Sequence, residues 1–215
     1  MLKRLCDIVA ATVGLCLLVP VFIVIAGVVK CSDGGPVFFR QRRIGRNAQP
    51  FAIWKFRTMV VQAERQGGQI TVGVDARVTP VGHWLRKSKL DEFPQLLNVL
   101  RGEMSLVGPR PEVPKYVALY SQDQRRVLEL KPGITDPSSI KYRDESSILA
   151  ACGDPERAYV EVIMPDKIRL NLEYAESANL FSDAWMIART LLRIVLPSSQ
   201  EPLPTHEVAP QQKAA

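Results

Sequence analysis

The N-terminal part of the chain contains one long apolar run. No charged residue occurs from Ile8 to Val29, with Asp7 before the run and Lys30 after it. A helix of roughly this length is needed to cross a hydrocarbon core of about 30 Å. A secretory signal peptide fits poorly, because the run is too long and no small-residue cleavage site follows it. The sequence therefore predicts a helix that enters a membrane.

Two features of this run argue against a straight transmembrane span. Pro20 lies near its middle, where proline removes a helix hydrogen bond and clashes with the preceding turn. Basic residues flank both ends, whereas a spanning helix usually carries them on one side. We therefore expect residues 1–31 to form a re-entrant helix-break-helix anchor, broken at Pro20, with both ends on the cytoplasmic side. A kinked single span is the alternative that the sequence leaves open.

Composition limits the remaining possibilities. The chain has 215 residues, and its net charge of +6 suggests an anionic partner, which could be nucleic acid, acidic lipid or a phosphorylated metabolite. Aromatic residues make up only 7% and no zinc-finger or RNP-type motif occurs, so we expect no nucleic-acid partner. The four cysteines have no CxxC spacing and are interpreted as reduced thiols facing the cytosol. We expect a folded domain over residues 32–196 and a disordered Pro-, Ser-, Gln- and Ala-rich tail over residues 197–215.

The stretch from Arg86 to Pro111, RKSKLDEFPQLLNVLRGEMSLVGPRP, is the strongest candidate for a functional site. It places the acidic pair Asp91-Glu92 at the start of an apolar helix, with Pro94 tolerated in the first turn. A helix cap and a first-turn acid would account for an isolated pair of this kind. They would not account for the surrounding arginines and the GPRP turn, which suit an anionic phosphate substrate beside a carboxylate.

The other elements predict a helix-rich α/β domain. Residues 37–39 and 51–54 have strand character around a turn at 45–47, giving a short β hairpin followed by Lys55 and Arg57. This basic hairpin is either a solvated surface or a phosphate- or membrane-binding one. Thr79-Pro80 is a helix start. Further helices are expected over residues 112–130, 159–177 and 181–195, the last suited to core packing or to a membrane interface.

Several motifs in this order and spacing resemble the bacterial sugar transferases, also called monotopic phosphoglycosyl transferases, of the compact single-domain type. The matching runs are KRLCD, GPVFFRQRRIG, KFRTM, LRKSKLDEFPQLLNVLRGEMSLVGPRP and KPGIT, and together they span nearly everything except the tail. There are three departures from the family pattern. Val19-Pro20 stands where Ser-Pro is common, Thr58 replaces a serine, and Lys89 takes a position that is usually small and polar.

The resemblance implies an activity and a set of roles. The activity is transfer of a sugar-1-phosphate from a UDP-sugar to polyprenyl (undecaprenyl) phosphate, with release of UMP, on the cytoplasmic face of the bacterial inner membrane. Asp91 would be the nucleophile and would bind Mg²⁺, and Glu92 would assist it. The substrate would be bound by Lys55, Arg57, Arg86, Pro109, Arg110 and Pro111. A non-catalytic basic module that binds the phospholipid surface is the alternative, and the sequence does not indicate an oligomeric state.

Overall fold

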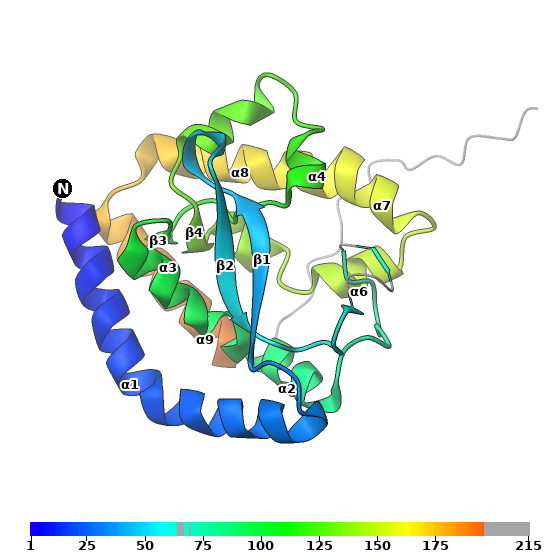
Figure 1. Cartoon of the computed structure of the whole chain (residues 1–215). Coiled ribbons are helices and arrows are strands. Elements are labelled where there is room, and N and C mark those ends of the chain that lie inside the picture. The colour runs from blue at the N-terminus through cyan, green and yellow to red at the C-terminus, as the bar shows by residue number, and fades with distance from the viewer. Residues whose placement is uncertain (64–66, 69, 196–215) are drawn as a thin grey trace, which may run out of the picture.

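The N-terminal helix frames the rest of the molecule. The computed structural model describes residues 1–63, 67–68 and 70–195, so the predicted disordered tail lies outside the described residues. Helix α1 (Leu2–Asp33) is helical throughout, including at Pro20. Figure 1 shows that it bends near its middle, so that its two halves run along two sides of the domain. The break expected at Pro20 therefore takes the form of a bend in a continuous helix.

Both ends of α1 are attached to the same domain. Near the N-terminal end, Asp7 accepts hydrogen bonds from Ser105 Oγ (2.8 Å) and Leu106 N (3.1 Å) in strand β3 (Ser105–Val107). At the C-terminal end, the Asp33 carboxylate pairs with both terminal nitrogens of Arg57. Because each pair links α1 to a different part of the domain, the position of the helix is fixed at both ends.

Three apolar clusters form the core. Two of them lie under α1, and the third fills the opposite side of the domain. The first joins α1 to helix α3 (Leu96–Arg101) and contains Ala11, Ile53, Leu96, Val99 and Met104. The second contains Ile25, Val29, Phe56 and Leu85. The third is the largest and includes Val113, Tyr116, Val127, Leu149, Tyr159 and Ile163.

The predicted β hairpin is confirmed, and its strands are longer than the sequence indicated. Strands β1 (Phe38–Ile44) and β2 (Pro50–Phe56) are antiparallel, with Phe39 opposite Lys55 and Arg43 opposite Phe51. Directly opposed residues share one face of a sheet, and residues two apart along a strand do so as well. Arg43 and Lys55 therefore lie on the same face of the hairpin, which is the face directed to the site described below.

A second, two-stranded sheet was missed by the sequence analysis. Strand β3 pairs in parallel with β4 (Gly133–Thr135). The two strands approach so closely that a Cβ on Gly108 would lie 2.3 Å from the Lys131 carbonyl oxygen. Strands of three residues are too short to show the alternation that identifies a strand in a sequence.

Helix α2 (Pro80–Ser88) starts as predicted, with the Thr79 hydroxyl accepting a hydrogen bond from Gly82 N at 3.0 Å. The prediction of a single helix over residues 112–130 is wrong. The chain instead forms α4 (Pro114–Val117) and the 3₁₀ helix η4 (Gln124–Glu129). Ser121 and Gln124 exchange side-chain-to-backbone hydrogen bonds that close a turn between these elements and start the second one.

The C-terminal part of the described chain is helical. It comprises α5 (Pro137–Lys141), α6 (Glu145–Ala150), α7 (Pro155–Ala158), the π-helical turn η5 (Tyr159–Ile163), α8 (Met164–Ser177) and α9 (Leu180–Val195). The helices predicted near residues 159–177 and 181–195 are therefore confirmed. Together with the hairpin and the apolar N-terminal helix, they confirm the predicted helix-rich α/β fold.

Candidate active site

The acidic pair lies where one helix ends and another begins. Lys89 ends α2 in the left-handed conformation (φ 58°), and the chain then enters the 3₁₀ helix η3 (Leu90–Gln95) and α3. Asp91 and Glu92 occupy the first turn of η3, and Pro94 is contained in it, close to the helix start that the sequence predicted. Asp91 is buried, with 6% exposed, and the Glu92 side chain is largely buried, with 17% exposed.

Asp91 is a buried carboxylate with an unsatisfied oxygen. Among the described residues, none forms a hydrogen bond with its Oδ1 atom. Burial, and then the negative charge of Glu92, raise the pKa of Asp91 to about 6, against the positive charges of Lys55, Arg86 and Lys89. Near neutral pH this carboxylate is thus mainly ionised and poorly compensated, which is the condition of a reactive group rather than of a helix cap.

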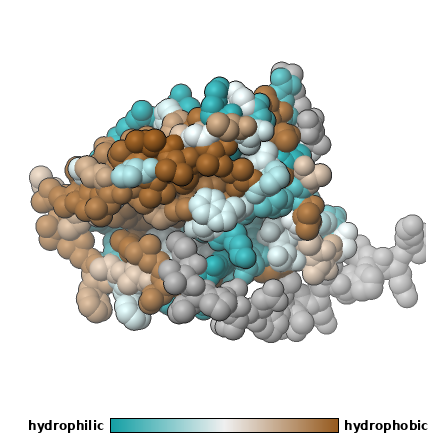
Figure 2. Space-filling view, turned by 90° about the horizontal axis from the view of Figure 1, so that it is seen from below, coloured by the Kyte–Doolittle hydropathy of each residue, from teal (hydrophilic) through white to brown (hydrophobic). Residues whose placement is uncertain are grey.

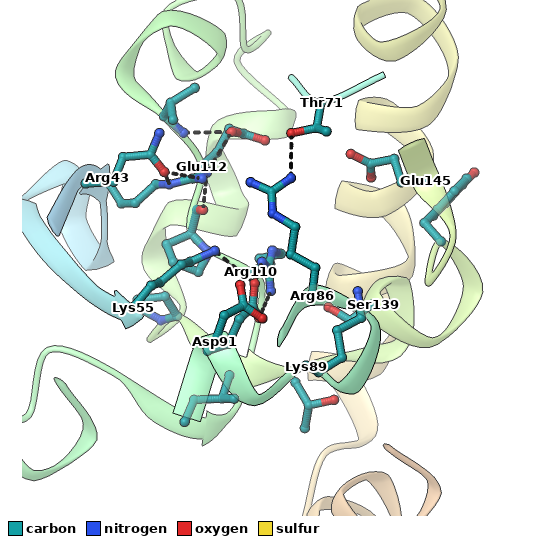
Figure 3. Close-up of a pocket in the computed structure, with 18 of the residues that line it drawn as sticks. Arg43, Lys55, Thr71, Arg86, Lys89, Asp91, Arg110, Glu112, Ser139 and Glu145 are labelled. Atoms are coloured by element: carbon teal, nitrogen blue, oxygen red, sulfur yellow. Dashed lines mark hydrogen bonds and ion pairs between the residues drawn. The ribbon is translucent and has the colours of Figure 1, made fainter. Parts of the chain in front are cut away.

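Glu92 differs from Asp91 in that it is fully paired. Lys55 Nζ donates to its Oε1 at 2.8 Å, and the two terminal nitrogens of Arg110 donate to its two oxygens, one of them at 2.8 Å. Burial alone raises the pKa of Glu92, but the charges of Arg110 and Lys55 outweigh this and hold the pKa well below its usual range. Figure 3 shows Lys55 and Arg110 converging beside Asp91.

Arg86 contributes a third cation with neutral partners. Its Nε donates to Thr58 Oγ1 at 2.9 Å and one terminal nitrogen donates to Thr71 Oγ1 at 3.2 Å (Figure 3). Burial lowers the pKa of Arg86, because its charge is partly removed from water. The threonine that replaces the commoner serine at position 58 keeps the hydroxyl that this contact uses.

The turn that carries Arg110 is held from several directions. Arg110 N donates to the fully buried carboxylate of Asp136 at 3.1 Å, and the Pro109 carbonyl accepts from Gly133 N at 3.0 Å. The Pro111 carbonyl accepts from Arg43 at 3.1 Å. The predicted substrate-binding segment Pro109–Pro111 is therefore held in place, and it presents the Arg110 side chain to Glu92.

These residues line a cleft of about 1390 Å³. Its wall contains all the residues predicted for catalysis and substrate binding: Lys55, Arg57, Arg86, Asp91, Glu92, Pro109, Arg110 and Pro111. On the other walls are residues that were not among the predicted site residues, among them Arg43, Thr71, Glu112, Ser139 and Glu145 (Figure 3). The Asp136-Pro137 pair followed by Ser139 is a helix-start pattern, and it could have indicated Asp136 and Ser139.

Arg57 also lines the cleft, but its guanidinium has partners outside the acidic pair. Its guanidinium is occupied by the Asp33 carboxylate at the end of α1, and its Nε donates to the Pro36 carbonyl at 2.6 Å. The side chain is only 7% exposed. These contacts give Arg57 a role in fixing α1, and a role in substrate binding stays a prediction.

The comparison with known proteins now identifies the family. Residues 1–197 match the model of the bacterial sugar transferase family. The chain belongs to this family. It is 36% identical to an uncharacterized sugar transferase, EpsL, of Bacillus subtilis over 195 residues, which are 91% of this chain and 88% of the relative. It is also 36% identical to the exopolysaccharide production protein ExoY of Rhizobium meliloti, over 91% of this chain and 86% of that protein.

A third relative is named for its activity. The chain is 37% identical to the UDP-glucose:undecaprenyl-phosphate glucose-1-phosphate transferase of Escherichia coli, over 90% of this chain and 40% of that longer protein. The bacterial sugar transferase described here is thus a transferase by family. Family membership favours this over the non-catalytic membrane-surface module.

Proposed function

We propose that this sugar transferase moves a sugar-1-phosphate from a UDP-sugar to polyprenyl phosphate, such as undecaprenyl phosphate, and releases UMP. The observation that carries the proposal is the contrast between the two adjacent acids. Asp91 has a buried, unpartnered oxygen, whereas Glu92 beside it is paired with Lys55 and Arg110. A carboxylate that is ionised but unpaired is suited to attack phosphorus, and nearby cations are suited to hold a diphosphate.

The reaction would proceed in two displacements at one phosphorus atom. An oxygen of Asp91 bonds to the β-phosphorus of the UDP-sugar while the bond from that phosphorus to the bridging oxygen of UMP breaks. A phosphate oxygen of the lipid then bonds to the same phosphorus, and the bond to Asp91 breaks. Dividing the transfer in this way separates the soluble substrate from the membrane-bound one.

The cations of the cleft would hold the negative charge in both steps. Arg110 offers a planar fork that matches two phosphate oxygens, although Glu92 holds it in this structure. Arg86 has only hydroxyl partners among its hydrogen bonds, so it can turn to a phosphate at little cost. Lys55, on strand β2 of the hairpin, adds a point charge. Pro109 and Pro111 stiffen the turn that aims the Arg110 side chain.

A magnesium ion fits this site. No group of three or more His, Cys, Asp or Glu side chains that could hold a metal occurs among the residues described. Mg²⁺ needs no such group, since it is usually bound by one or two carboxylates together with substrate phosphates and water. The unpartnered oxygen of Asp91 supplies a suitable ligand. When bound, Mg²⁺ would neutralise charge on the diphosphate.

We further propose that α1 is a re-entrant anchor on the cytoplasmic face of the bacterial plasma membrane. Among the described helices, α1 is long and apolar enough to cross a membrane, and only 11% of its most apolar window is buried. Figure 2 shows a continuous hydrophobic band over it. The attachments of Asp7 and Asp33 to one domain support a path that enters and leaves on the same side. Exposed aromatic residues occur on neighbouring helices, where they suit a membrane interface, at Trp84, Phe181 and Trp185.

The test of the proposed function is direct. Purified protein in lipid nanodiscs is incubated with Mg²⁺, polyprenyl phosphate and each of a panel of UDP-sugars, and UMP release is measured. We expect at least one UDP-sugar to give multiple-turnover release of UMP, and this continued release should depend on the lipid phosphate. Absence of UMP from every donor tested would contradict the proposal.

A further inference from the structure

The hydrogen bonds of Glu92 are those that a bound phosphate group would make. Its two oxygens receive the planar fork of Arg110, and one of them also receives Lys55 Nζ. An arginine fork matches carboxylate and phosphate equally well. The Arg110 side chain is 33% exposed and so can be reached from the cleft, whereas those of Lys55 and Glu92 are 15% and 17% exposed.

The empty cleft needs an anion at this position. Without Glu92, the largely buried charges of Lys55 and Arg110 would have no counter-ion among their hydrogen-bond partners, and removing one member of such a pair is strongly destabilising. Asp91 does not supply the anion, since its Oδ1 makes no hydrogen bond within the described part of the chain. Glu92 therefore compensates the cations while Asp91 stays unpaired.

A bound diphosphate changes the balance of charge around Lys55 and Arg110. Its oxygens and those of Glu92 compete for the same donors, and Asp91, Glu92 and the phosphate would repel one another if Glu92 kept both cations. We infer that Glu92 is an internal placeholder for a phosphate group, which neutralises Lys55 and Arg110 in the empty protein and gives up the Arg110 fork when a phosphate binds. The inference rests on the proposed function of the cleft.

The placeholder has two consequences for binding. The displaced Glu92 carboxylate stays close to Lys89, whose positive charge acts on both Asp91 and Glu92. Opening the pair between Glu92 and Arg110 lowers the net affinity for every phosphate ligand, the products included. A ligand that makes only the phosphate contacts is therefore released easily. A whole substrate makes further contacts, and these keep the pair between Glu92 and Arg110 open.

The test is the binding of inorganic phosphate to the full-length protein in nanodiscs, at pH 8 and with divalent metals chelated. Glu92→Gln removes the placeholder charge and should tighten phosphate binding by roughly tenfold or more, the value of one charge-assisted hydrogen bond. Asp91→Asn is the matched control, because it removes the same charge from the neighbouring residue and leaves Arg110 paired with Glu92. It should tighten binding by less than about threefold.

Glu92→Asp keeps the charge but is one methylene too short to reach both cations, and it covers the case in which Glu92→Gln does not fold. It should also bind phosphate more tightly than the wild type, whereas a purely electrostatic effect predicts no change. Unchanged or weaker binding in the Glu92 variants, or equal tightening in Asp91→Asn, overturns the inference. If the placeholder inference is overturned in an enzyme that still releases UMP, the proposed function of the cleft survives. If phosphate binds to no variant and no UMP is released, the inference and the proposed function both fail.

Discussion

The guanidinium of Arg110 forms its two-pronged ion pair with Glu92 and not with Asp91, although the two acids are adjacent in the chain. This choice gives the acids opposite properties. The pKa of Glu92 is held well below its usual range, while burial and the charge of Glu92 raise the pKa of Asp91 to about 6. Environments that separate the pKa values of two neighbouring groups in this way commonly separate their roles as well.

The Arg110 fork can be tested by substitution. Arg110→Ala should lower kcat/KM for the UDP-sugar by roughly ten- to a hundredfold, the value of a charge-assisted hydrogen bond. Arg110→Lys should recover little of the loss, because a point charge does not replace a planar fork. Arg125→Ala, at an exposed position on η4, is the control and should keep normal kinetics. Normal kinetics in both Arg110 variants would remove this residue from the site.

The raised pKa of Asp91 predicts an acid limb in the pH profile of activity. Only the ionised carboxylate can attack phosphorus, so the rate of UMP release in the absence of lipid should fall about tenfold per pH unit below the pKa of about 6. Above that pH the rate should be level. A rate that stays constant down to pH 4.5 in a protein that remains folded would contradict the assignment.

The same shift predicts that Asp91 destabilises the folded protein at neutral pH. Its pKa rises from 3.8 to about 6 on folding, so the folded state binds the proton more tightly and stability is lost as the pH rises from about 4 to 6. Asp91→Asn should therefore raise the free energy of unfolding by about 1–3 kcal/mol at pH 7 and by much less at pH 4. Thermal unfolding at the two pH values measures this, and a variant less stable than the wild type at pH 7 would contradict it.

The attachment of the anchor at Asp7 should matter for stability. Asp7→Ala leaves the buried Ser105 hydroxyl and the Leu106 N–H without their acceptor, which should cost about 1–3 kcal/mol. The exposed Asp123, on the approach to η4, provides the control, and Asp123→Ala should change stability by less than about 0.5 kcal/mol. Equal stability of the two variants would show that the Asp7 contacts contribute nothing net.

The path of α1 can be tested by labelling. In a variant whose four native cysteines are replaced by serine, one new cysteine is placed at Leu2 and another at Ser121. A re-entrant helix attached to the domain at both ends predicts that both sites react with a membrane-impermeant thiol reagent only from the cytoplasmic side. Reaction of the Leu2 site from the opposite side would show a true span.

Much of this architecture followed from local sequence signals. The apolar run predicted the N-terminal helix, which bends where a break at Pro20 was expected. Thr79-Pro80 predicted the start of α2, because a proline and a cap act on their own turn. The pairing of β3 with β4 could not be predicted, since it depends on contact between segments separated in sequence and on strands too short for a pattern. The turn at Ser121 was missed because the apolar spacing continued across it.

The site residues also divide into those that local sequence signals predicted and those whose contacts join distant segments. The motif around Asp91 placed the acids and Arg110 together, because they lie on one short stretch of chain. It could not indicate that Arg57 would pair with Asp33, or that Asp136 would accept a hydrogen bond from the Arg110 backbone. Both contacts join segments that are distant in the sequence. Nor could it show which of the two adjacent acids would receive the cations. That depends on where strand β2 and the Arg110 turn place Lys55 and Arg110.

The central claim is that Asp91 carries the sugar-phosphate during the reaction, and mass spectrometry of the protein after incubation with UDP-sugar and Mg²⁺, without lipid, tests it most directly. The wild type should release UMP in a burst and gain the mass of one phosphosugar on the tryptic peptide Leu90–Arg101, with fragmentation assigning it to Asp91 and not to Glu92. Asp91→Asn should fold, bind the membrane and gain no mass. A phosphosugar on any other residue, or turnover by Asp91→Asn, would contradict the account.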